Sequence, residues 1–434
     1  MDDSKVLYAN EIELYFDTLE IFDVSDIGSS RWLQQHERIY QLSLQALLDA
    51  KSGGEELVKE LVIMHQKIPQ LVLDLITTEM WRLKILPLFL KWKFRPKSTI
   101  PLYMVLYHEV TLVSFFEAVL FHEDVMESAS DVLIDLTDFC YRNILPLTSP
   151  KSEAEVEEDV GDEMKQLLEQ KKEIEFELGV KCISILSYMT QHLKIISLSV
   201  LHRLLAVHDV PLLFTNLICD PPWIREVNDG EEKYCDGKWN KLSKKASVKL
   251  NKIEGQIWMA LIQFLMHPEC QKKYEVTDFR KDQLLRLRSK LSGFVTDQMP
   301  ILNELVRFLE HLNIFDAPTP KSDLIIEQIP EIWESMHSKN HNWKQISKFQ
   351  MENYFLLSEE ELKNFCKRLC RTFDLKNIEA MLPDAPSCAA CGGRGLKRCS
   401  RCKNEWYCGR ACQVSHWEKH RNLCDLTATT SSTS

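Results

Sequence analysis

The chain has 434 residues, of which 45% are hydrophobic, enough for a sizeable core and for two or three domains. Its formal net charge is −11, with 64 acidic residues against 53 basic ones. Because phosphate contacts require clustered lysine and arginine, this balance argues against a general nucleic-acid-binding protein. The first ten residues, MDDSKVLYAN, lack the basic and apolar regions of a signal peptide, so we expect a soluble intracellular protein.

Residues 1–380 show helical periodicity, with apolar residues at spacings of three and four after Pro69, and strand-like alternation is scarce. A short loop, a proline and an apolar helix occur at Pro69 and again at Pro211. The same succession leads into the last helix of an armadillo-like repeat, but no fixed period separates the two copies. We predict a mainly α-helical region, either an armadillo/HEAT-like array or an irregular helical bundle.

The longest apolar stretch, Pro101 to Phe121, contains His108, Glu109 and Glu117. Ionisable side chains are costly inside a membrane-spanning helix. We therefore interpret this stretch as a buried helix and expect no membrane insertion.

Two segments interrupt the helical pattern. Seven of the eleven residues from Glu153 to Glu163 are acidic, so residues 149–163 are predicted to form a mobile acidic loop. Residues 229–240 contain Gly230 and Gly237 at the ends of a possible small hairpin, and we interpret Cys235 within it as a loop residue.

The C-terminal part divides into short segments. Prolines in residues 316–323 predict a connection, and those in residues 381–387 predict a semi-rigid linker. Residues 388–424 are predicted to form a zinc finger, and residues 425–434 a disordered tail. Seven of the fourteen cysteines fall in the finger, and the others are interpreted as reduced core residues: Cys140, Cys182, Cys219, Cys235, Cys270, Cys366 and Cys370.

The finger contains four closely spaced pairs of metal-ligand residues. Structural zinc sites take four cysteine or histidine ligands, so eight ligands predict two closed, non-catalytic zinc sites. A disulfide framework is disfavoured by the odd number of cysteines and by the absence of a secretory signal. The eight predicted ligands are Cys388, Cys391, Cys399, Cys402, Cys408, Cys412, His420 and Cys424.

The predicted helix from about Arg410 to Arg421 decides how these ligands are shared. Cys412 and His420 are eight residues apart, which corresponds to roughly 12 Å along a helix. One ion cannot bind both, so we predict interleaved sites: the first and third pairs bind one zinc ion, and the second and fourth pairs bind the other. His416, one turn from both residues, is a rival ligand, with local packing as the favoured alternative.

The finger differs from the rest of the chain in charge. Its eight basic and two acidic residues give +6, which leaves −17 for the remaining residues. Seven thiolates and two Zn²⁺ ions reduce the charge of the finger to about +3. This charge suits acidic segments of a protein partner and is too small to indicate DNA binding.

These residues closely resemble the MYND zinc finger family, through the segments CAAC, CSRC, NEWYCGRACQVSHW and HRNLC. The resemblance implies a cross-braced two-zinc module that binds short proline-containing peptides rather than DNA. Gln413 and Trp417 match positions that contribute to the peptide groove of the family. The alternative for Trp417 is packing that covers the zinc core.

The wider chain resembles a family of MYND proteins that assist the assembly of axonemal dynein arms, through segments such as WLQQHERI, LQALLDA, LIIEQIPEIWE and KRCSRCKNEWYC. The resemblance implies a cytoplasmic adaptor or co-chaperone in ciliated cells, near the centrosome, the centriolar satellites or the apical region. Its implied partners are a leucine-rich-repeat assembly factor, chaperones and axonemal dynein chains.

Two other classes of function compete with the adaptor. Some MYND proteins are nuclear transcriptional corepressors, but the chain has neither a clear basic localisation run nor a second DNA-binding motif. Others are lysine methyltransferases, and residues 54–57 echo one fragment of their catalytic domain. That fragment lies in helical sequence without its usual companion motif, so we expect no enzymatic activity.

Overall fold

The computed structural model divides between Ser358 and Glu359 into two compact units, a helical unit and a unit that contains the finger. The structure describes residues 7–52, 56–148, 161–227, 230–235, 237–241, 249–315, 328–339, 341–372, 388–391, 393, 395, 397–401 and 405–430.

In the N-terminal half of the helical unit, every regular element among the described residues is a helix. Its α-helices and 3₁₀ helices (η) are α1 (Ala9–Asp17), η1 (Val24–Asp26), α2 (Ser30–Ser52), α3 (Leu57–Met64), α4 (Ile68–Lys84), α5 (Leu86–Lys91), α6 (Ile100–Val119), α7 (Glu123–Ser128), η2 (Ser130–Val132), α8 (Leu133–Ile144) and η3 (Leu145–Thr148).

The C-terminal half adds a small sheet to further helices, among which η4 and η6 are π-helical turns. Its elements are α9 (Asp162–Gln191), α10 (Leu198–His202), η4 (Arg203–Val207), α11 (Val210–Cys219), β1 (Ile224–Val227), β2 (Gly230–Cys235), β3 (Lys238–Lys241), α12 (Lys252–Met266), α13 (Pro268–Gln271), α14 (Asp278–Leu285), η5 (Arg286–Ser289), α15 (Gly293–Gln298), α16 (Leu302–Ile314), α17 (Glu331–Ser338), α18 (Trp343–Gln350) and η6 (Met351–Phe355).

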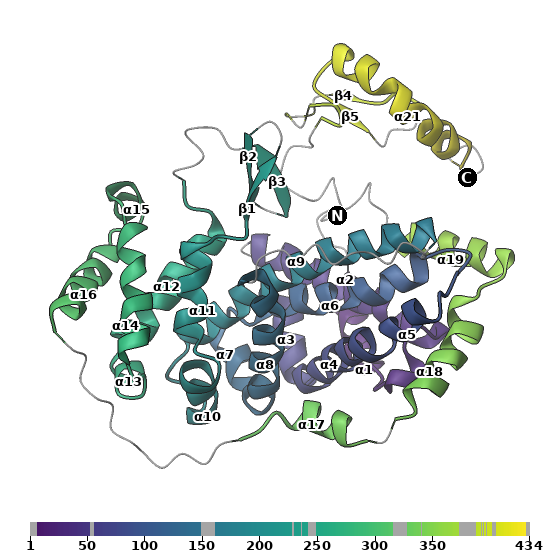
Figure 1. Cartoon of the computed structure of the whole chain (residues 1–434). Coiled ribbons are helices and arrows are strands. Elements are labelled where there is room, and N and C mark those ends of the chain that lie inside the picture. Colours follow the sequence, from purple (N-terminus) through teal and green to yellow (C-terminus); the bar gives the residue numbers. More distant parts are fainter. Residues whose placement is uncertain are drawn as a thin grey trace. The chain divides into compact units, whose positions relative to one another are not determined.

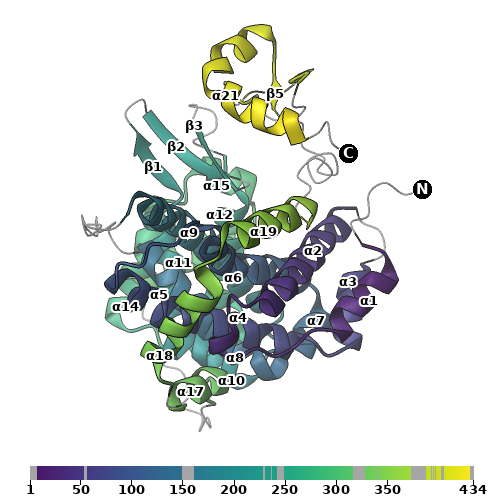
Figure 2. The same ribbon diagram turned by 90° about the vertical axis from the view of Figure 1, so that its right-hand side faces the viewer.

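The main helices form two layers. Helices α2, α6, α9 and α12 pack in succession, each against the next, while α4, α8 and α11 pack against α6, α9 and α12 (Figure 1; Figure 2). Pro69 and Pro211 are the second residues of α4 and α11, where a missing N–H costs no intrahelical hydrogen bond. Pro101 is likewise the second residue of α6 in the other layer, so the recurring proline pattern marks helix starts in both layers. The mainly α prediction is confirmed, and the packing is that of an array with unequal helices, from 10 residues in α11 to 30 in α9.

Helix α6 forms the centre of the array. It is long and apolar enough to cross a membrane, as is the bent pair of α10 with η4 and α11, but 72% of its apolar window is buried inside the unit. A helix that is apolar on all sides is expected in such a core. Its buried Glu109 receives two hydrogen bonds from Arg82, at 2.7 Å and 2.9 Å, and its buried His108 lies 3.2 Å from Asp74. The ionisable residues of α6 are thus paired within the protein.

Residues 328–358, the return segment, pack on the N-terminal half of the array (Figure 1). Asp135 of α8 accepts hydrogen bonds from the backbone amides of Ile332 and Trp333, at 3.1 Å and 3.2 Å, and so caps α17. The Trp81 indole of α4 donates to the side-chain oxygen of Gln350 at 2.9 Å. These contacts join residues far apart in the sequence.

The end of the return segment is fixed by close packing. The Phe355 ring lies 5.9 Å from Trp81 and 5.6 Å from Phe89, between ring centroids. Gly28 has a φ of +90°, and a Cβ atom there would lie 2.5 Å from the Phe355 ring. Only glycine combines this backbone conformation with so close a neighbour.

The predicted hairpin is present and forms part of a three-stranded antiparallel sheet, in the order β1–β2–β3. Gly237 has a φ of +78° between β2 and β3, and Cys235 ends β2 rather than lying in a loop. The Tyr234 ring packs 5.0 Å from Phe176 of α9, between centroids, and thereby fastens the sheet to the array.

Other predicted boundaries also shift. Helix α9 begins at Asp162, so the last two residues of the predicted acidic loop are helical, where their charges favour the helix N-terminus. Residues 149–160, 316–327 and 381–387 lie outside the described part of the chain. Among the other cysteines, four are buried and Cys235 and Cys366 are half-buried, all as free thiols, whereas the side chain of Cys370 is not described.

The second unit contains α19 (Glu359–Thr372), β4 (Lys397–Arg398), β5 (Trp406–Tyr407) and α21 (Arg410–Thr430). Helix α21 begins where it is predicted but ends at Thr430 instead of Arg421. Residues 425–430 are thus helical rather than disordered, because extending an existing helix costs far less than starting one.

Candidate metal centre

A short hairpin and one helix form the backbone of the finger. Strands β4 and β5 pair antiparallel, with Arg398 opposite Trp406. The Arg398 guanidinium lies 4.5 Å from the centroid of the Trp406 ring. The backbone amide of Ala389 donates to the Trp406 carbonyl at 2.9 Å, and that of Cys399 donates to the Glu405 carbonyl at 2.8 Å. These bonds hold the first two cysteine turns against the hairpin.

The first group of ligands contains Cys388, Cys391, Cys408 and Cys412, whose sulfur atoms all lie within 4.8 Å of one another. The Cys391 and Cys408 sulfurs are 3.7 Å apart, and the Cys408 and Cys412 sulfurs are 3.2 Å apart. Four sulfurs in a tetrahedron around zinc, each about 2.3 Å from the ion, would be separated by about 3.8 Å. The spacing of this group therefore fits one zinc ion.

The second group contains Cys399, His420 and Cys424, whose ligand atoms also lie within 4.8 Å of one another. The two sulfurs are 3.8 Å apart, and the three residues are buried, with at most 4% of their surface exposed. Cys402, the predicted fourth ligand, lies outside the described residues. Three converging buried ligands, with Cys402 close in sequence, fit a second structural zinc site.

The two groups are interleaved along the chain. Helix α21 supplies Cys412 to the first group and His420 to the second, as the distance along the helix requires. The structure therefore brings seven of the eight predicted ligands into the two predicted sets.

His416 belongs to neither group. Its Nδ1 atom lies 3.2 Å from the Tyr407 hydroxyl, and its ring stacks on His420 with centroids 6.2 Å apart. His416 therefore contacts its neighbours instead of belonging to a ligand group, which is the favoured alternative for this residue.

The apolar core of the finger consists almost entirely of ligands. Its buried cluster contains Cys388, Cys399, Cys424 and Tyr407, so Tyr407 is the one member that is not a predicted ligand. The ligand spacing does not single out Tyr407, because it is not itself a metal ligand. Tyr407 directly precedes the ligand Cys408 and follows the less buried Trp406 in β5. This position is the signal that identifies Tyr407 as a core residue.

Clustering of the thiols changes their acidity in the metal-free chain. Burial opposes ionisation of Cys388, but three neighbouring backbone amides donate to its sulfur and lower its pKa to about 6. A hydrogen bond with Cys408 raises the pKa of Cys412 to about 12. Without a cation the group therefore does not ionise fully, whereas a divalent ion stabilises four thiolates together. The donor set fits a zinc ion, which would supply structural cross-linking rather than a reactive position.

The two residues predicted for the peptide groove lie on α21. Gln413 is half-buried, and its backbone amide donates to the Gly409 carbonyl at 3.2 Å. Trp417 is 36% exposed, and its ring meets His420 edge-on at 6.0 Å between centroids. Trp417 thus covers part of the second group and also presents an aromatic face to solvent, beside Val414, which is 66% exposed.

Comparison with known proteins agrees with this geometry. Residues 388–424 match the MYND finger family, whose members mediate protein–protein interactions. The chain is 30% identical to "Zinc finger MYND domain-containing protein 10 homolog" of Drosophila melanogaster, over 96% of this chain and 98% of the relative.

Shorter similarities also occur. Ubiquitin C-terminal hydrolase 15 of Oryza sativa subsp. japonica is 37% identical over 51 residues, which cover 12% of this chain and 5% of the relative. Ubiquitin carboxyl-terminal hydrolase 19 of Arabidopsis thaliana is 44% identical over 43 residues, which cover 10% of this chain and 6% of the relative. No solved structure matches the chain. Because the Drosophila relative matches the helical unit and the finger together, the chain belongs to the zinc finger MYND domain-containing protein 10 family.

Proposed function

We propose that this chain is a non-enzymatic adaptor, or co-chaperone, for the cytoplasmic preassembly of axonemal dynein arms. The observation that carries the proposal is the similarity to one family over 96% of the chain, because it includes the helical unit as well as the finger. A MYND finger alone is consistent with many partners, whereas the similarity to the Drosophila relative extends through the helical unit.

The two units support separate binding tasks. The four cysteines of the first ligand group, and the three described ligands of the second together with the predicted Cys402, suit structural sites without an open position for a substrate. The exposed faces of Trp417 and Val414 suit an extended peptide of a leucine-rich-repeat assembly factor. The helical unit would then engage chaperones or dynein chains, near the centrosome, the centriolar satellites or the apical region of ciliated cells.

The proposal is tested by affinity purification of the tagged full chain from ciliating cells, followed by mass spectrometry. Dynein chains, chaperones and a leucine-rich-repeat protein should be recovered with the unmodified chain. The Cys399→Ala variant should lose the leucine-rich-repeat protein, while Cys366→Ser, which alters a cysteine outside the finger, should retain it. Recovery of chromatin corepressors without dynein chains would contradict the proposal and favour a nuclear adaptor.

A further inference from the structure

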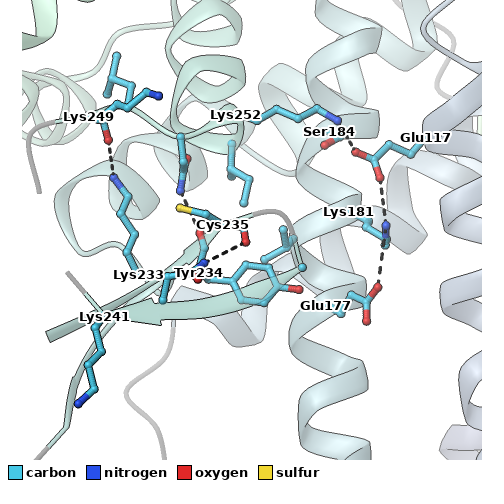
Figure 3. Close-up of a pocket in the computed structure, with 16 residues that line it drawn as sticks. Glu117, Glu177, Lys181, Ser184, Lys233, Tyr234, Cys235, Lys241, Lys249 and Lys252 are labelled. Carbon is cyan, nitrogen blue, oxygen red and sulfur yellow. Dashed lines mark hydrogen bonds and ion pairs between the residues drawn. The ribbon is translucent and has the colours of Figure 1, made fainter. Parts of the chain in front are cut away.

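A cavity of about 580 Å³ lies in the helical unit, bordered by β2, β3, α9 and the beginning of α12 (Figure 3). It is remote in sequence from the zinc ligands and contains none of them. Tyr234 is 7% exposed and anchors the sheet at its wall. The cavity is thus bounded by well-packed elements rather than by the surface of one loop.

Its lining is strongly basic for so acidic a chain. Two acidic residues, Glu117 and Glu177, are outnumbered by five lysines, which leaves a formal charge of +3. Glu254 pairs with one lysine from behind the wall and reduces this to +2. The five lysines are Lys181, Lys233, Lys241, Lys249 and Lys252.

The carboxylates of the cavity are already engaged. Glu117 accepts from Lys181 at 3.2 Å and from Lys252 at 2.9 Å (Figure 3). Burial opposes ionisation of Glu117, but these two lysines outweigh it and lower its pKa. Glu254 accepts from Lys233 at 2.7 Å. Glu117 and Glu254 are therefore already occupied by the lysines beside them.

Lys249 is the lysine that this arrangement leaves available. It is exposed, and its ammonium group forms no ion pair with the described residues. Lys252, three residues later and the first residue of α12, is 60% exposed and shares Glu117 with Lys181. Both ammonium groups can therefore approach an anion from the side of the cavity formed by the start of α12.

The start of α12 adds partial positive charge at the same place. Asn251 caps this 15-residue helix, accepting from the Glu254 amide at 2.7 Å. The next two residues, Lys252 and Ile253, line the cavity, where the first amide groups of a helix favour negative charge. The cationic side chains and the helix terminus thus act in the same direction.

We propose that this cavity binds an acidic peptide segment of a protein partner. The lysines come from α9, β2, β3 and the entry to α12, and so they suit carboxylates spaced along a chain. A compact polyphosphate is disfavoured, because the carboxylates of Glu117 and Glu177 lie among the lysines and would repel it. Nucleic acid is disfavoured because the cavity contains no arginine and its tyrosine is buried, which leaves no face on which bases stack.

The test uses the full zinc-loaded chain and a fluorescein-labelled octapeptide of alternating glutamate and valine, with binding followed by fluorescence anisotropy. The peptide should bind, and binding should weaken as salt rises from about 0.05 to 0.3 M because the contacts are partly exposed. Lys249→Glu should weaken binding about tenfold through loss of an attraction and gain of a repulsion. Because the Lys249 ammonium group forms no ion pair with the described residues, this change breaks no ion pair of the described fold.

Lys290→Glu is the matched control, since Lys290 is also exposed and lies outside the cavity. It should leave the affinity within twofold, and an equivalent octapeptide with glutamine in place of glutamate should bind at least tenfold more weakly. The proposal is overturned if Lys249→Glu and Lys290→Glu weaken binding equally, or if the glutamine peptide binds as well. Tighter binding of tripolyphosphate or of single-stranded RNA at the same cavity would also overturn it.

Discussion

The helical unit and the finger are stabilised in opposite ways. The helical unit buries four tryptophans almost completely: Trp32, Trp81, Trp223 and Trp258. The buried cluster of the finger contains three zinc ligands and Tyr407. An apolar core stabilises the first unit through burial of surface from water, whereas the second depends on metal binding for most of its folding free energy. The two units should therefore respond independently to metal, core mutation and pH.

Removal of zinc should have the largest effect. Chelation, or Cys399→Ala, should unfold the finger, because structural zinc supplies about 10 kcal/mol or more of apparent binding free energy. Proteolysis should then cleave within residues 388–424, while the thermal transition of the helical unit stays unchanged. Cys366→Ser should leave the finger resistant. A large decrease in the melting temperature of the helical unit would show that the two units are not independent.

Truncation of a side chain in the helical core should destabilise the helical unit and leave the finger unchanged. Trp81→Ala removes an indole that packs on Phe355 and donates to Gln350, and should destabilise the unit by about 3–5 kcal/mol. Phe349→Ala, at a position 49% exposed, should change stability by less than about 0.5 kcal/mol. Calorimetry measures both changes, and zinc analysis should still find two ions per chain. Loss of zinc from the Trp81→Ala variant would contradict the comparison.

On acidification, the helical unit and the finger should lose their stability at different pH values. Burial opposes ionisation of Asp138, but hydrogen bonds from His208 and Arg203 lower its pKa. A lowered folded-state pKa contributes stability that is present above the unfolded-state value and lost as pH falls through the folded one, below about 4. The finger should lose zinc at a higher pH, because protons compete for its thiolates and His420.

Stability of the helical unit and zinc content, measured across pH, check this order. Asp138→Asn should reduce the acid dependence of the helical unit without changing the pH at which zinc is released. Loss of helical-unit stability and of zinc at the same pH would contradict this order.

Trp417→Ala should have the smallest effect on folding. Its ring is partly exposed, so we expect a loss of less than about 1 kcal/mol from the finger and unchanged zinc content. Binding of a proline-containing peptide should nevertheless weaken, as measured by isothermal calorimetry. Unchanged peptide affinity would restrict Trp417 to covering the zinc core.

Sequence reasoning predicted the features that depend on residues close together in the chain and missed those that depend on distant residues. Ligand spacing and helix rise predicted both groups of zinc ligands, since these depend on neighbours within 37 residues. The return segment could not be predicted, because the Trp81–Gln350 bond joins residues 269 positions apart and leaves no local pattern. The Arg82–Glu109 pair was hidden for the same reason, although Glu109 alone stood out in an apolar stretch.

Zinc content of the purified full chain, measured by inductively coupled plasma mass spectrometry, tests the two-zinc finger most directly. The structure predicts two zinc ions per chain, and loss of both after either Cys391→Ala or Cys399→Ala, because α21 supplies ligands to both interleaved groups and the finger unfolds as one module. One ion in the unmodified chain would contradict the account.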